Sequence, residues 1–547
     1  MKSQGMTDSM MSLSEAGKAI DARMVGKDVR FRAVATDSRK IVAGDLFVAL
    51  RGDNFDGYEF VPGALQSGAV AAIVNADSYE ANPSGLSTQP SVLSPQHSVL
   101  VVPDTRLALG QLAAYWRRKF EVPLVAITGS NGKTTVKEML ASILREAAGS
   151  DDAVLATKGN LNNDIGMPLT LLELNARHRY AVIEMGMNHP GEIDYLARIA
   201  CPDVALINNA SGAHLEGLGS VEAVAQAKGE IFAGLDDHGT AMINADDAHA
   251  PLWRGLAGTR QLLEFGLDGD ADIAGAWRPQ DGGLHLDVQT PQGGFSVQLQ
   301  VPGEHNARNA LAATTAAIAL NVPLDTIAEG LKKFGGVAGR LQRKAAKRGA
   351  VLIDDTYNAN PASMRAAIGV LAQVGGKHIF VLGDMGELGE GAAAFHAEIG
   401  GEAKRAGIEK LYALGELSRN ATREFGDGAK HFERIEDLLA ELDKELDADV
   451  TVLVKGSRFM KMERVVAHCV DTTATVGRKS AAPSDVCEPS DVCEPSDVCE
   501  PSDVCEPSDV CEPSDVCEPC SDAADNAELI RPTAHPTAQS TGEKTCF

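Results

Sequence analysis

Apolar runs of about five residues alternate with helix-forming segments through most of this 547-residue chain. Alternation of this kind is typical of a parallel β-sheet whose faces are covered by helices. The sequence therefore predicts an α/β fold built mainly from parallel strands. The predicted strands are VPLVAIT (122–128), YAVIEMGM (180–187), PDVALINNAS (202–211), GTAMINADD (239–247), VLIDD (351–355), HIFVLGD (378–384), KLYALGE (410–416) and VTVLVKG (450–456).

Changes in composition divide the chain into four parts. A Ser/Pro-rich stretch at 78–105 closes the first part, and a hairpin-like piece at 284–301 precedes a helix expected to start near Asn306. We expect a small N-terminal α/β domain for substrate binding at 1–104, and a central P-loop-type ATPase domain with a mainly parallel sheet at 105–336. A C-terminal domain of dinucleotide-fold type at 337–478 and an acidic tail at 479–547 complete the division.

The tail repeats SDVCEP six times between 484 and 519. Proline at every sixth position blocks a helix, and one valine per unit cannot build a core, so the tail is expected to be disordered. Its cysteines could instead bind a metal, although only Cys517 and Cys520 have a chelating spacing. The two other cysteines, Cys201 and Cys469, are expected to be reduced and buried.

The charge is strongly acidic. The chain has a net charge of −26, of which the residues after 480 carry −14. An acidic excess argues against nucleic-acid binding, because phosphate backbones require clustered Lys and Arg. The opening residues have no apolar core flanked by basic residues, and the sequence has no apolar window of about 18 residues, so we expect no transmembrane segment and a cytoplasmic location. We also expect a monomer.

The segment VAITGSNGKTTVKEML at 125–140 resembles a phosphate-binding loop between a strand and a helix. The usual pattern starts with a glycine five positions before its Gly-Lys pair, where this chain has Ile127. Backbone N–H groups at a helix start attract phosphate, Lys133 would neutralise it, and Thr134 would offer its hydroxyl to Mg²⁺. The alternative is an ordinary strand-to-helix turn. The predicted ATP-binding loop residues are Gly129, Ser130, Asn131, Gly132, Lys133, Thr134 and Thr135.

Polar residues follow two further predicted strands at the same sheet edge. Glu184 ends one strand and could hold the metal, unless it is only solvated. His214 follows the next strand, and ligands of open α/β sheets collect at such strand ends. Lys228, within a helix, is by itself most simply a solvated lysine. Asn306 and Asn309 share one face of a helix start and suit the edge of an adenine, although Asn306 could also cap the helix.

The motifs GSNGKTT, EMG, HLEGLGS, AKGEIF, GEHNARNALAA, GRLQ and DDTYNANP, in this order, resemble the Mur ligases. These are ATP-dependent amide-forming enzymes of peptidoglycan precursor synthesis, and the resemblance spans about 20–475. The segments at 36–60 and 157–172, together with VLGDMGELGE and VLVKGSRFMKMERVV, are most similar to the branch that joins D-alanyl-D-alanine to UDP-N-acetylmuramoyl-tripeptide. No pattern of this family includes the SDVCEP tail.

The resemblance implies ATP and two Mg²⁺ ions as cofactors, and a carbamylated Lys228 that helps to hold the second ion. It implies catalytic roles for Lys133, Lys228, His214 and Arg340, and metal contacts for Thr134, Glu184, His214 and Lys228. Asn306 and Asn309 would meet adenine, Asp355 the ribose and Arg340 the phosphates. The implied substrate-binding residues are Ser38, Arg39, Asn160, Asn162, Asn163, Asn358, Asn360 and Lys455.

Other functions stay open at this point. Folate polyglutamylating enzymes have a related loop, but a glycine normally follows the lysine, where this chain has Thr134. The ligase that adds diaminopimelate carries Asp-Asn-Pro-Arg in its last domain, and this sequence has none. A P-loop switch or motor that only hydrolyses ATP would not need the third α/β part. An inactive scaffold would not need the full set of phosphate and metal residues.

Overall fold

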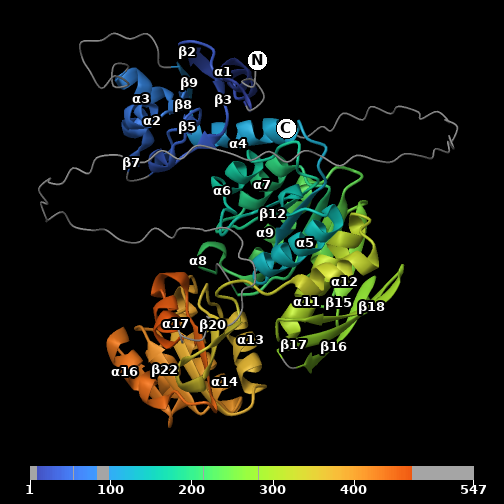
Figure 1. Ribbon diagram of the computed structural model, residues 1–547, viewed down its shortest axis with the longest axis vertical. Coiled ribbons are helices and arrows are strands. Elements are labelled where there is room, and N and C mark those ends of the chain that lie inside the picture. Colours follow the sequence, from blue (N-terminus) through green and yellow to red (C-terminus); the bar gives the residue numbers. More distant parts are fainter. Residues whose placement is uncertain (1–8, 53–54, 83–97, 213–214, 281, 471–547) are drawn as a thin grey trace, which may run out of the picture. The chain divides into compact units, whose positions relative to one another are not determined.

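The computed structural model describes residues 9–52, 55–82, 98–212, 215–280 and 282–470 (Figure 1). Within these residues the chain forms α/β domains with mainly parallel sheets, as the alternation predicted. The predicted tail, His214 and part of the Ser/Pro-rich stretch lie outside the described residues.

The N-terminal domain contains a five-stranded sheet in the order β2-β9-β8-β5-β4, in which only β2 pairs antiparallel. Two short antiparallel pairs, β1 with β3 and β6 with β7, accompany it. Its elements are β1 (Met11–Ser12), α1 (Leu13–Ala19), β2 (Arg23–Val25), β3 (Arg30–Phe31), β4 (Val34–Ala35), β5 (Leu46–Val48), β6 (Arg51–Gly52), β7 (Phe55–Asp56), α2 (Val61–Gln66), β8 (Ala71–Asn75), α3 (Ala76–Ala81) and β9 (Ser98–Val102).

The central domain is built on a nine-stranded sheet in the order β11-β12-β10-β13-β14-β15-β16-β17-β18. Neighbouring strands from β11 across to β16 pair in parallel, whereas β16 pairs antiparallel with β17 and β17 pairs antiparallel with β18. The strands are β10 (Leu124–Thr128), β11 (Val154–Ala156), β12 (Tyr180–Glu184), β13 (Val204–Ile207), β14 (Thr240–Asn244), β15 (Gln261–Gly266), β16 (Ile273–Gln280), β17 (Gly283–Thr290) and β18 (Gly293–Leu299). The helices are α4 (Thr105–Arg117), α5 (Lys133–Ala148), α6 (Gly166–Leu171), α7 (Glu192–Ala200), α8 (Leu215–Leu218), α9 (Val221–Gly229), α10 (Ala250–Ala257), α11 (Glu304–Ala319) and α12 (Leu324–Lys333).

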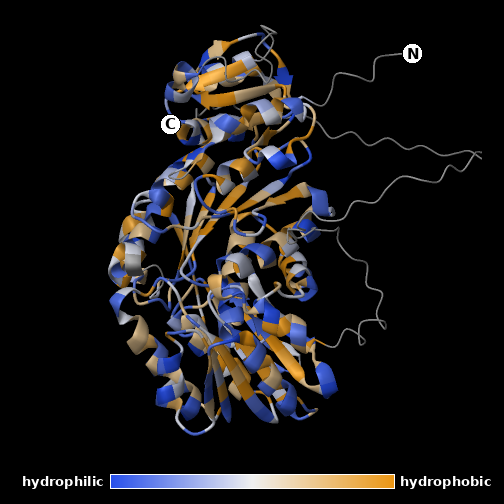
Figure 2. Cartoon of the chain, turned by 90° about the vertical axis from the view of Figure 1, so that its left-hand side faces the viewer, coloured by the Kyte–Doolittle hydropathy of each residue, from blue (hydrophilic) through white to orange (hydrophobic). Residues whose placement is uncertain are grey.

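Strand β10 shows why these strands are continuous apolar runs. Successive side chains of a strand point to opposite faces of a sheet. Leu124 and Ala126 pack with α4, α6 and α7 on one face, and Val125 and Ile127 pack with α5, α11 and α12 on the other. Because helices cover both faces, every position is apolar, and the strands are mostly coloured hydrophobic in Figure 2.

The C-terminal domain has a six-stranded sheet in the order β19-β20-β24-β21-β22-β23, parallel except for β19. Helices α13, α14 and α15 pack on one face, and α16 and α17 pack on the other. The elements are β19 (Gln342–Ala345), β20 (Val351–Asp355), α13 (Pro361–Ala372), β21 (Lys377–Gly383), α14 (Ala392–Arg405), β22 (Lys410–Leu414), α15 (Arg419–Phe425), β23 (Ala429–Phe432), α16 (Ile435–Glu445), β24 (Val450–Lys455) and α17 (Glu463–Cys469).

The expected hairpin is present as β17 and β18. Helix α7 begins at Glu192, because the preceding Gly191 has a φ of 85° that no α-helix contains. The helix expected near Asn306 begins at Glu304. None of the described helices is long and apolar enough to cross a membrane.

Candidate active site

The predicted phosphate loop joins the end of β10 to the start of α5, as the sequence indicated. Gly132 precedes α5 with a φ of 79°. A Cβ atom at this position would lie 2.4 Å from Oδ1 of Asn309 and 2.5 Å from Nδ2 of Asn208. The loop therefore needs glycine here both for its backbone conformation and for space.

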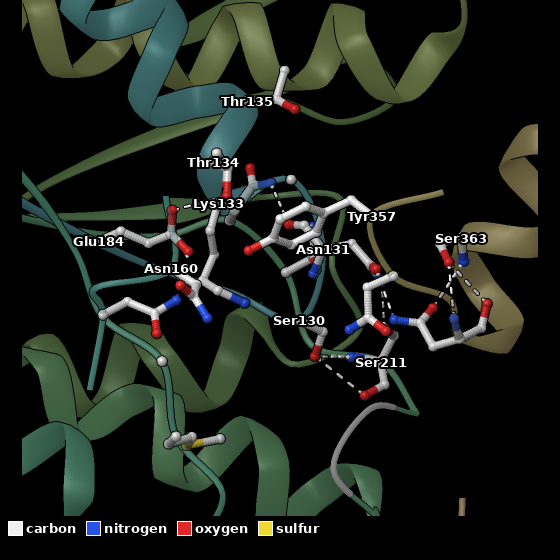
Figure 3. Close-up of a pocket in the computed structure, with 18 of the residues that line it drawn as sticks. Ser130, Asn131, Lys133, Thr134, Thr135, Asn160, Glu184, Ser211, Tyr357 and Ser363 are labelled. Carbon is white, nitrogen blue, oxygen red and sulfur yellow. Dashed lines mark hydrogen bonds between the residues drawn. The ribbon is translucent and has the colours of Figure 1, made fainter. Parts of the chain in front are cut away.

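Asparagines that follow β13 hold the loop. The Asn131 backbone N–H donates to Oδ1 of Asn209 at 2.9 Å, and Nδ2 of Asn208 donates to the Asn131 carbonyl oxygen at 2.9 Å. Figure 3 shows Ser130 and Asn131 beside Ser211, which accepts a hydrogen bond from Nδ2 of Asn131 at 2.9 Å. These supporting residues were not predicted from the sequence. Their signal was a pair of asparagines at the end of a strand expected beside the loop's own strand.

Glu184 lies directly beside the loop, as Figure 3 shows. Oγ1 of Thr134 donates to Oε2 of Glu184 at 2.9 Å, and Nδ2 of Asn162 donates to Oε1 at 2.8 Å. The carboxylate is buried, so the alternative of a solvated glutamate is wrong. Nζ of Lys133 donates to the Gly129 carbonyl oxygen at 2.7 Å. Burial lowers the pKa of the Lys133 ammonium, and the charge of Glu184 opposes this shift.

Arg340 also contacts the hydroxyl group of Thr134. Its Nη2 atom donates to Oγ1 of Thr134 at 2.9 Å, and its guanidinium lies 4.3 Å from the centre of the Tyr357 ring. Among the described residues, the buried Nε atom of Arg340 has no hydrogen-bond partner. A buried donor normally has an acceptor, so this position suits an anion that binds between Arg340 and the loop.

Lys228 lies on α9 with 1% of its surface exposed. Burial lowers the pKa of its ammonium far below the usual value, and the charge of Lys133 adds to the shift. The interpretation of Lys228 as a solvated helix lysine is therefore wrong.

Asn306 and Asn309 project from the first turns of α11 and are buried. Asn309 receives a hydrogen bond from Nδ2 of Asn208 at 3.0 Å and donates to Oδ1 of Asn306 at 3.3 Å. Gly303 is the N-cap of α11, and the Asn306 amide donates to the Pro302 carbonyl oxygen at 2.7 Å instead of capping the helix.

Asp355 ends β20 and forms an ion pair with Lys455, which ends β24. Oδ2 of Asp355 lies 2.6 Å from Nζ of Lys455, and Oδ1 accepts the Leu341 backbone N–H at 3.2 Å. His305 also lines this region, and burial lowers its pKa to about 4. The imidazole is thus neutral at pH 7.

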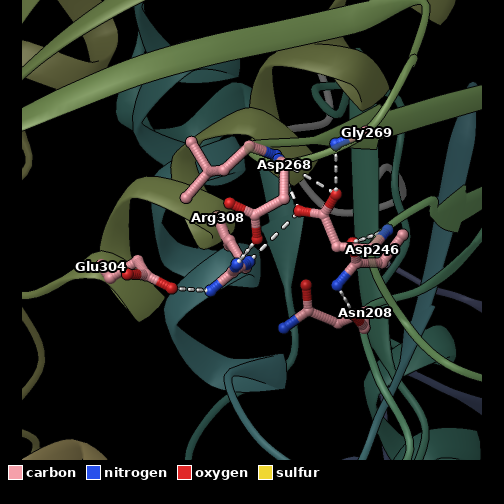
Figure 4. A network of polar contacts seen from close by, with 8 residues as sticks. Asn208, Asp246, Asp268, Gly269, Glu304 and Arg308 are labelled. Atoms are coloured by element: carbon pink, nitrogen blue, oxygen red, sulfur yellow. Dashed lines mark hydrogen bonds and ion pairs between the residues drawn. The ribbon is translucent and has the colours of Figure 1, made fainter.

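A polar network fixes the start of α11 (Figure 4). Arg308 forms ion pairs with Glu304, Asp246 and Asp268. The buried Asp246 carboxylate also accepts the backbone N–H groups of Leu267, Asp268 and Gly269 at 2.7–3.1 Å. The network therefore ties the helix that carries Asn306 and Asn309 to the loops that follow β14 and β15.

The substrate-binding residues implied by the resemblance do not all line the same cavity. Asn160, Asn162, Asn163, Asn358, Asn360 and Lys455 line one cavity together with the loop and Asp355. Asn360 caps α13, and its Nδ2 atom donates to Oδ1 of Asn131 at 2.8 Å. Ser38 and Arg39 lie on a short 3-10 helix, Ser38–Lys40, and do not line this cavity. Arg39 is exposed and pairs with Asp37 at 2.9 Å.

This cavity has a volume of about 1560 Å³. Pockets for a single drug-sized ligand measure about 300–1,000 Å³, so this one has room for a nucleotide and a second molecule. No group of three or more His, Cys, Asp or Glu side chains in the described part of the chain could hold a metal ion by itself.

The sheet order, the loop and the cavity define a nucleotide-binding α/β protein of the P-loop class. Ligands of such sheets bind at the carboxyl ends of the strands, where the strand order reverses. Here that point lies between the neighbouring strands β10 and β13. The strand that follows β10 in the chain, β11, lies on one side of this point in the sheet, and the strand that follows β13, β14, lies on the other side.

Comparison with known proteins identifies the family. Residues 30–117 match the Mur ligase family catalytic domain, 127–317 the Mur ligase middle domain, and 339–458 the Mur ligase glutamate ligase domain. The UDP-N-acetylmuramoyl-tripeptide--D-alanyl-D-alanine ligase of Escherichia coli is 41% identical over 83% of this chain and 97% of its own length. The chain belongs to the Mur ligase family.

Solved structures agree. A crystal structure of MurF from Acinetobacter baumannii matches with a TM-score of 0.76 and 36% identity, covering 84% of this chain and 99% of that one. MurF ligase from Thermotoga maritima in complex with ADP matches with a TM-score of 0.68 and 28% identity, covering 80% of this chain and 96% of that one.

Proposed function

We propose that this chain joins D-alanyl-D-alanine to the terminal carboxylate of UDP-N-acetylmuramoyl-tripeptide, with ATP converted to ADP and phosphate. The observation that carries the proposal is one large cavity, which is lined both by the phosphate loop of the central domain and by residues of the C-terminal domain. The relatives that match most of this chain bear the name of that activity.

The chemistry requires activation of a poor electrophile. The tripeptide carboxylate attacks the γ-phosphorus of ATP, giving an acyl phosphate and ADP. The amine of D-alanyl-D-alanine then attacks the acyl carbon, loses a proton and expels phosphate. The first step brings two anions together, so Lys133 and Arg340 would offset the repulsion and stabilise the transferring group.

The residues beside the loop fit Mg²⁺. The Thr134 hydroxyl and the Glu184 carboxylate are oxygen donors 2.9 Å apart, and Mg²⁺ prefers one or two such protein ligands besides substrate phosphates. Mg²⁺ would supply charge neutralisation at the phosphate oxygens. His214, another proposed ligand, lies outside the described residues.

We further propose that Lys228 acts as its carbamate and supplies a carboxylate for a second ion. A neutral amine is required for addition to carbon dioxide, and the burial that lowers the pKa of Lys228 favours that neutral form. The charge of Lys133 would also stabilise a nearby anion.

The remaining roles follow the same proposal. Asn306 and Asn309 would bind adenine, Asp355 the ribose, and the sugar-peptide would contact Ser38, Arg39, Asn160, Asn162 and Asn163. Asn358, Asn360 and Lys455 would bind substrate from the C-terminal domain. We propose the domain limits 1–104, 105–336 and 337–478, and a monomer in the cytoplasm.

A ligation assay tests the activity. The purified chain, ATP, Mg²⁺, UDP-N-acetylmuramoyl-tripeptide and D-alanyl-D-alanine are incubated, and products are identified by mass spectrometry. A UDP-sugar pentapeptide that forms only when all components are present is expected. ATP hydrolysis that ignores both peptide substrates would instead indicate a switch or motor.

The carbamate has its own test. Lys228→Ala is expected to be nearly inactive, and a small carboxylic acid added in solution is expected to restore part of the activity by filling the vacated position. Lys404→Ala, which removes an exposed lysine of the C-terminal domain, is the control. Full activity of Lys228→Ala without added acid would contradict the proposal.

A further inference from the structure

A lysine to which the proposed function gives no role is buried beside the phosphate loop. Lys137 lies on α5, one helical turn after Thr134, and only 1% of its surface is exposed. Its neighbours on the helix, Val136, Leu140 and Ala141, pack in the apolar core. A lysine is almost never fully buried unless its charge has partners, because removing the charge from water is costly. A charge at this position therefore needs specific contacts.

The ammonium group of Lys137 holds the backbone just after β11. Its Nζ atom donates a hydrogen bond to the carbonyl oxygen of the buried Thr157, and it lies 2.8 Å from Oε1 of Glu138. Thr157 follows Ala156, the last residue of β11, so its carbonyl group lies beyond the residues that pair with β12. A buried carbonyl group needs a donor, and Lys137 supplies one from a neighbouring helix.

Thr157 in turn supports Glu184, the carboxylate proposed to hold Mg²⁺. The Oγ1 atom of Thr157 accepts the Glu184 backbone N–H at 2.9 Å. The Glu184 carboxylate accepts the Thr134 hydroxyl at 2.9 Å, a bond drawn as a dashed line in Figure 3. Because Thr134 and Lys137 belong to the same helix, the four residues form a closed ring of contacts between α5, the end of β11 and the end of β12.

The ring anchors a loop that lines the main cavity. This segment, 157–165, leads from β11 to α6 and is called the asparagine loop below. Its residues on the cavity wall are Gly159, Asn160, Asn162, Asn163 and Asp164. Nδ2 of Asn162 donates to Oε1 of Glu184 at 2.8 Å. Since Thr157 is its first residue, the asparagine loop begins at the carbonyl group that Lys137 holds.

We propose that Lys137 is a positioning residue that sets the asparagine loop against the phosphate loop during ligation. Lys137 does not line the cavity, so it acts through the asparagine loop and not by touching a substrate. In the proposed function, asparagines of this loop contact the UDP-sugar-peptide, and α5 carries groups that bind the nucleotide phosphates. Lys137 therefore helps to set the distance between the attacking carboxylate and the γ-phosphorus, which must approach to about 3–3.5 Å. The inference rests on the proposed function.

Direct binding separates this role from general support of the fold. Lys137→Met keeps a side chain of similar length but removes the donor to the Thr157 carbonyl oxygen. The Kd for UDP-N-acetylmuramoyl-tripeptide is measured by calorimetry with β,γ-methylene-ATP and Mg²⁺ present. We expect it to rise about tenfold, the scale of a lost hydrogen bond to a charged group, while the KM for D-alanyl-D-alanine stays unchanged. A lysine that only supports the core would lower the unfolding temperature and leave this Kd unchanged, which would overturn the inference.

Two control variants isolate the bond to Thr157. Glu138→Gln removes the ion pair of Lys137 and leaves that bond in place. Lys158→Met removes an exposed lysine of the asparagine loop, which pairs with Glu173 at 2.8 Å. Both variants are expected to bind UDP-N-acetylmuramoyl-tripeptide with the Kd of the unchanged chain. A rise in Glu138→Gln equal to that in Lys137→Met would assign the effect to the ion pair and overturn the inference.

A pair of variants at Thr157 tests the same path of contacts and decides the case if Lys137→Met does not fold. Thr157→Val keeps the shape of the side chain and removes the acceptor of the Glu184 N–H, whereas Thr157→Ser keeps that acceptor. Thr157→Val is expected to weaken binding of UDP-N-acetylmuramoyl-tripeptide several-fold, and Thr157→Ser is expected to bind it nearly as the unchanged chain does. Equal Kd values for the two variants would overturn the inference.

The same measurements distinguish this inference from the proposed function. An unchanged chain that binds UDP-N-acetylmuramoyl-tripeptide but forms no pentapeptide would overturn the proposed function, and the Kd values would still decide the role of Lys137. An unchanged chain that does not bind the UDP-tripeptide would overturn both. Normal ligation and an unchanged Kd in Lys137→Met would overturn this inference alone.

Discussion

Gly132→Ala tests the geometry of the phosphate loop. The substitution places a side chain at a φ of 79°, which costs about 1–2 kcal/mol. The new Cβ atom would also lie 2.4 Å from Oδ1 of Asn309 and 2.5 Å from Nδ2 of Asn208, and such overpacking adds about 1–3 kcal/mol. We expect a total destabilisation of about 2–5 kcal/mol.

Gly149→Ala is the matched control. Gly149 follows the other end of α5 with a φ of 68°, and a Cβ atom there would meet nothing within 4 Å. The two variants therefore share the backbone cost and differ only in the clash. In thermal unfolding, the difference of about 1–3 kcal/mol corresponds to about 2–12 °C for a domain of this size.

The two variants are also expected to differ in ligation. Gly132→Ala displaces the two asparagines that hold the loop and the proposed adenine site, so its ligation rate is expected to fall sharply. Gly149→Ala is expected to keep normal ligation. Equal unfolding temperatures and equal ligation rates for the two variants would refute the reasoning.

Three further outcomes are expected. Lys133→Ala lowers turnover by at least about a hundredfold, the scale for a lost preorganised charge, and near-normal ligation would contradict its role. Arg308→Met raises the KM for ATP about tenfold, because α11 loses the ion pairs that hold its first turn in place. Arg308→Lys recovers part of this loss. An unchanged KM for ATP in Arg308→Met would show that the network does not position the nucleotide. A chain that ends at residue 478 keeps full ligase activity under reducing conditions, and a large loss would show that the tail contributes.

Local patterns predicted the architecture because the inner parallel strands of the central and C-terminal sheets are buried on both faces. That burial makes the strand a continuous apolar run, as in β10 and β24. Strand β19 was not predicted, because its sequence QRKA is polar and carries no strand pattern of its own, and it forms a strand only by pairing with β20 at the edge of the sheet.

The candidate site was predictable where a side chain lies at or just after the end of a parallel strand. Glu184 ends β12, and Thr134 lies in the first turn of α5, which follows β10. The parallel pairing of β10 and β12 brings the two side chains together. Lys228 was not predictable from the residues alone. Its burial results from tertiary packing around α9, which contacts α7 and α10, and only the resemblance to the Mur ligases distinguished it from a surface lysine. The support of Asn131 by Asn208 and Asn209 likewise depends on tertiary contacts.

The transfer of one oxygen atom tests the central claim most directly. UDP-N-acetylmuramoyl-tripeptide labelled with ¹⁸O in both oxygens of its terminal carboxylate is incubated with the chain, ATP, Mg²⁺ and D-alanyl-D-alanine. If the carboxylate takes the γ-phosphoryl group before the amine attacks, each phosphate released contains one ¹⁸O and the new amide keeps the other. Pentapeptide accompanied by unlabelled phosphate, or labelled phosphate without any pentapeptide, would contradict the account.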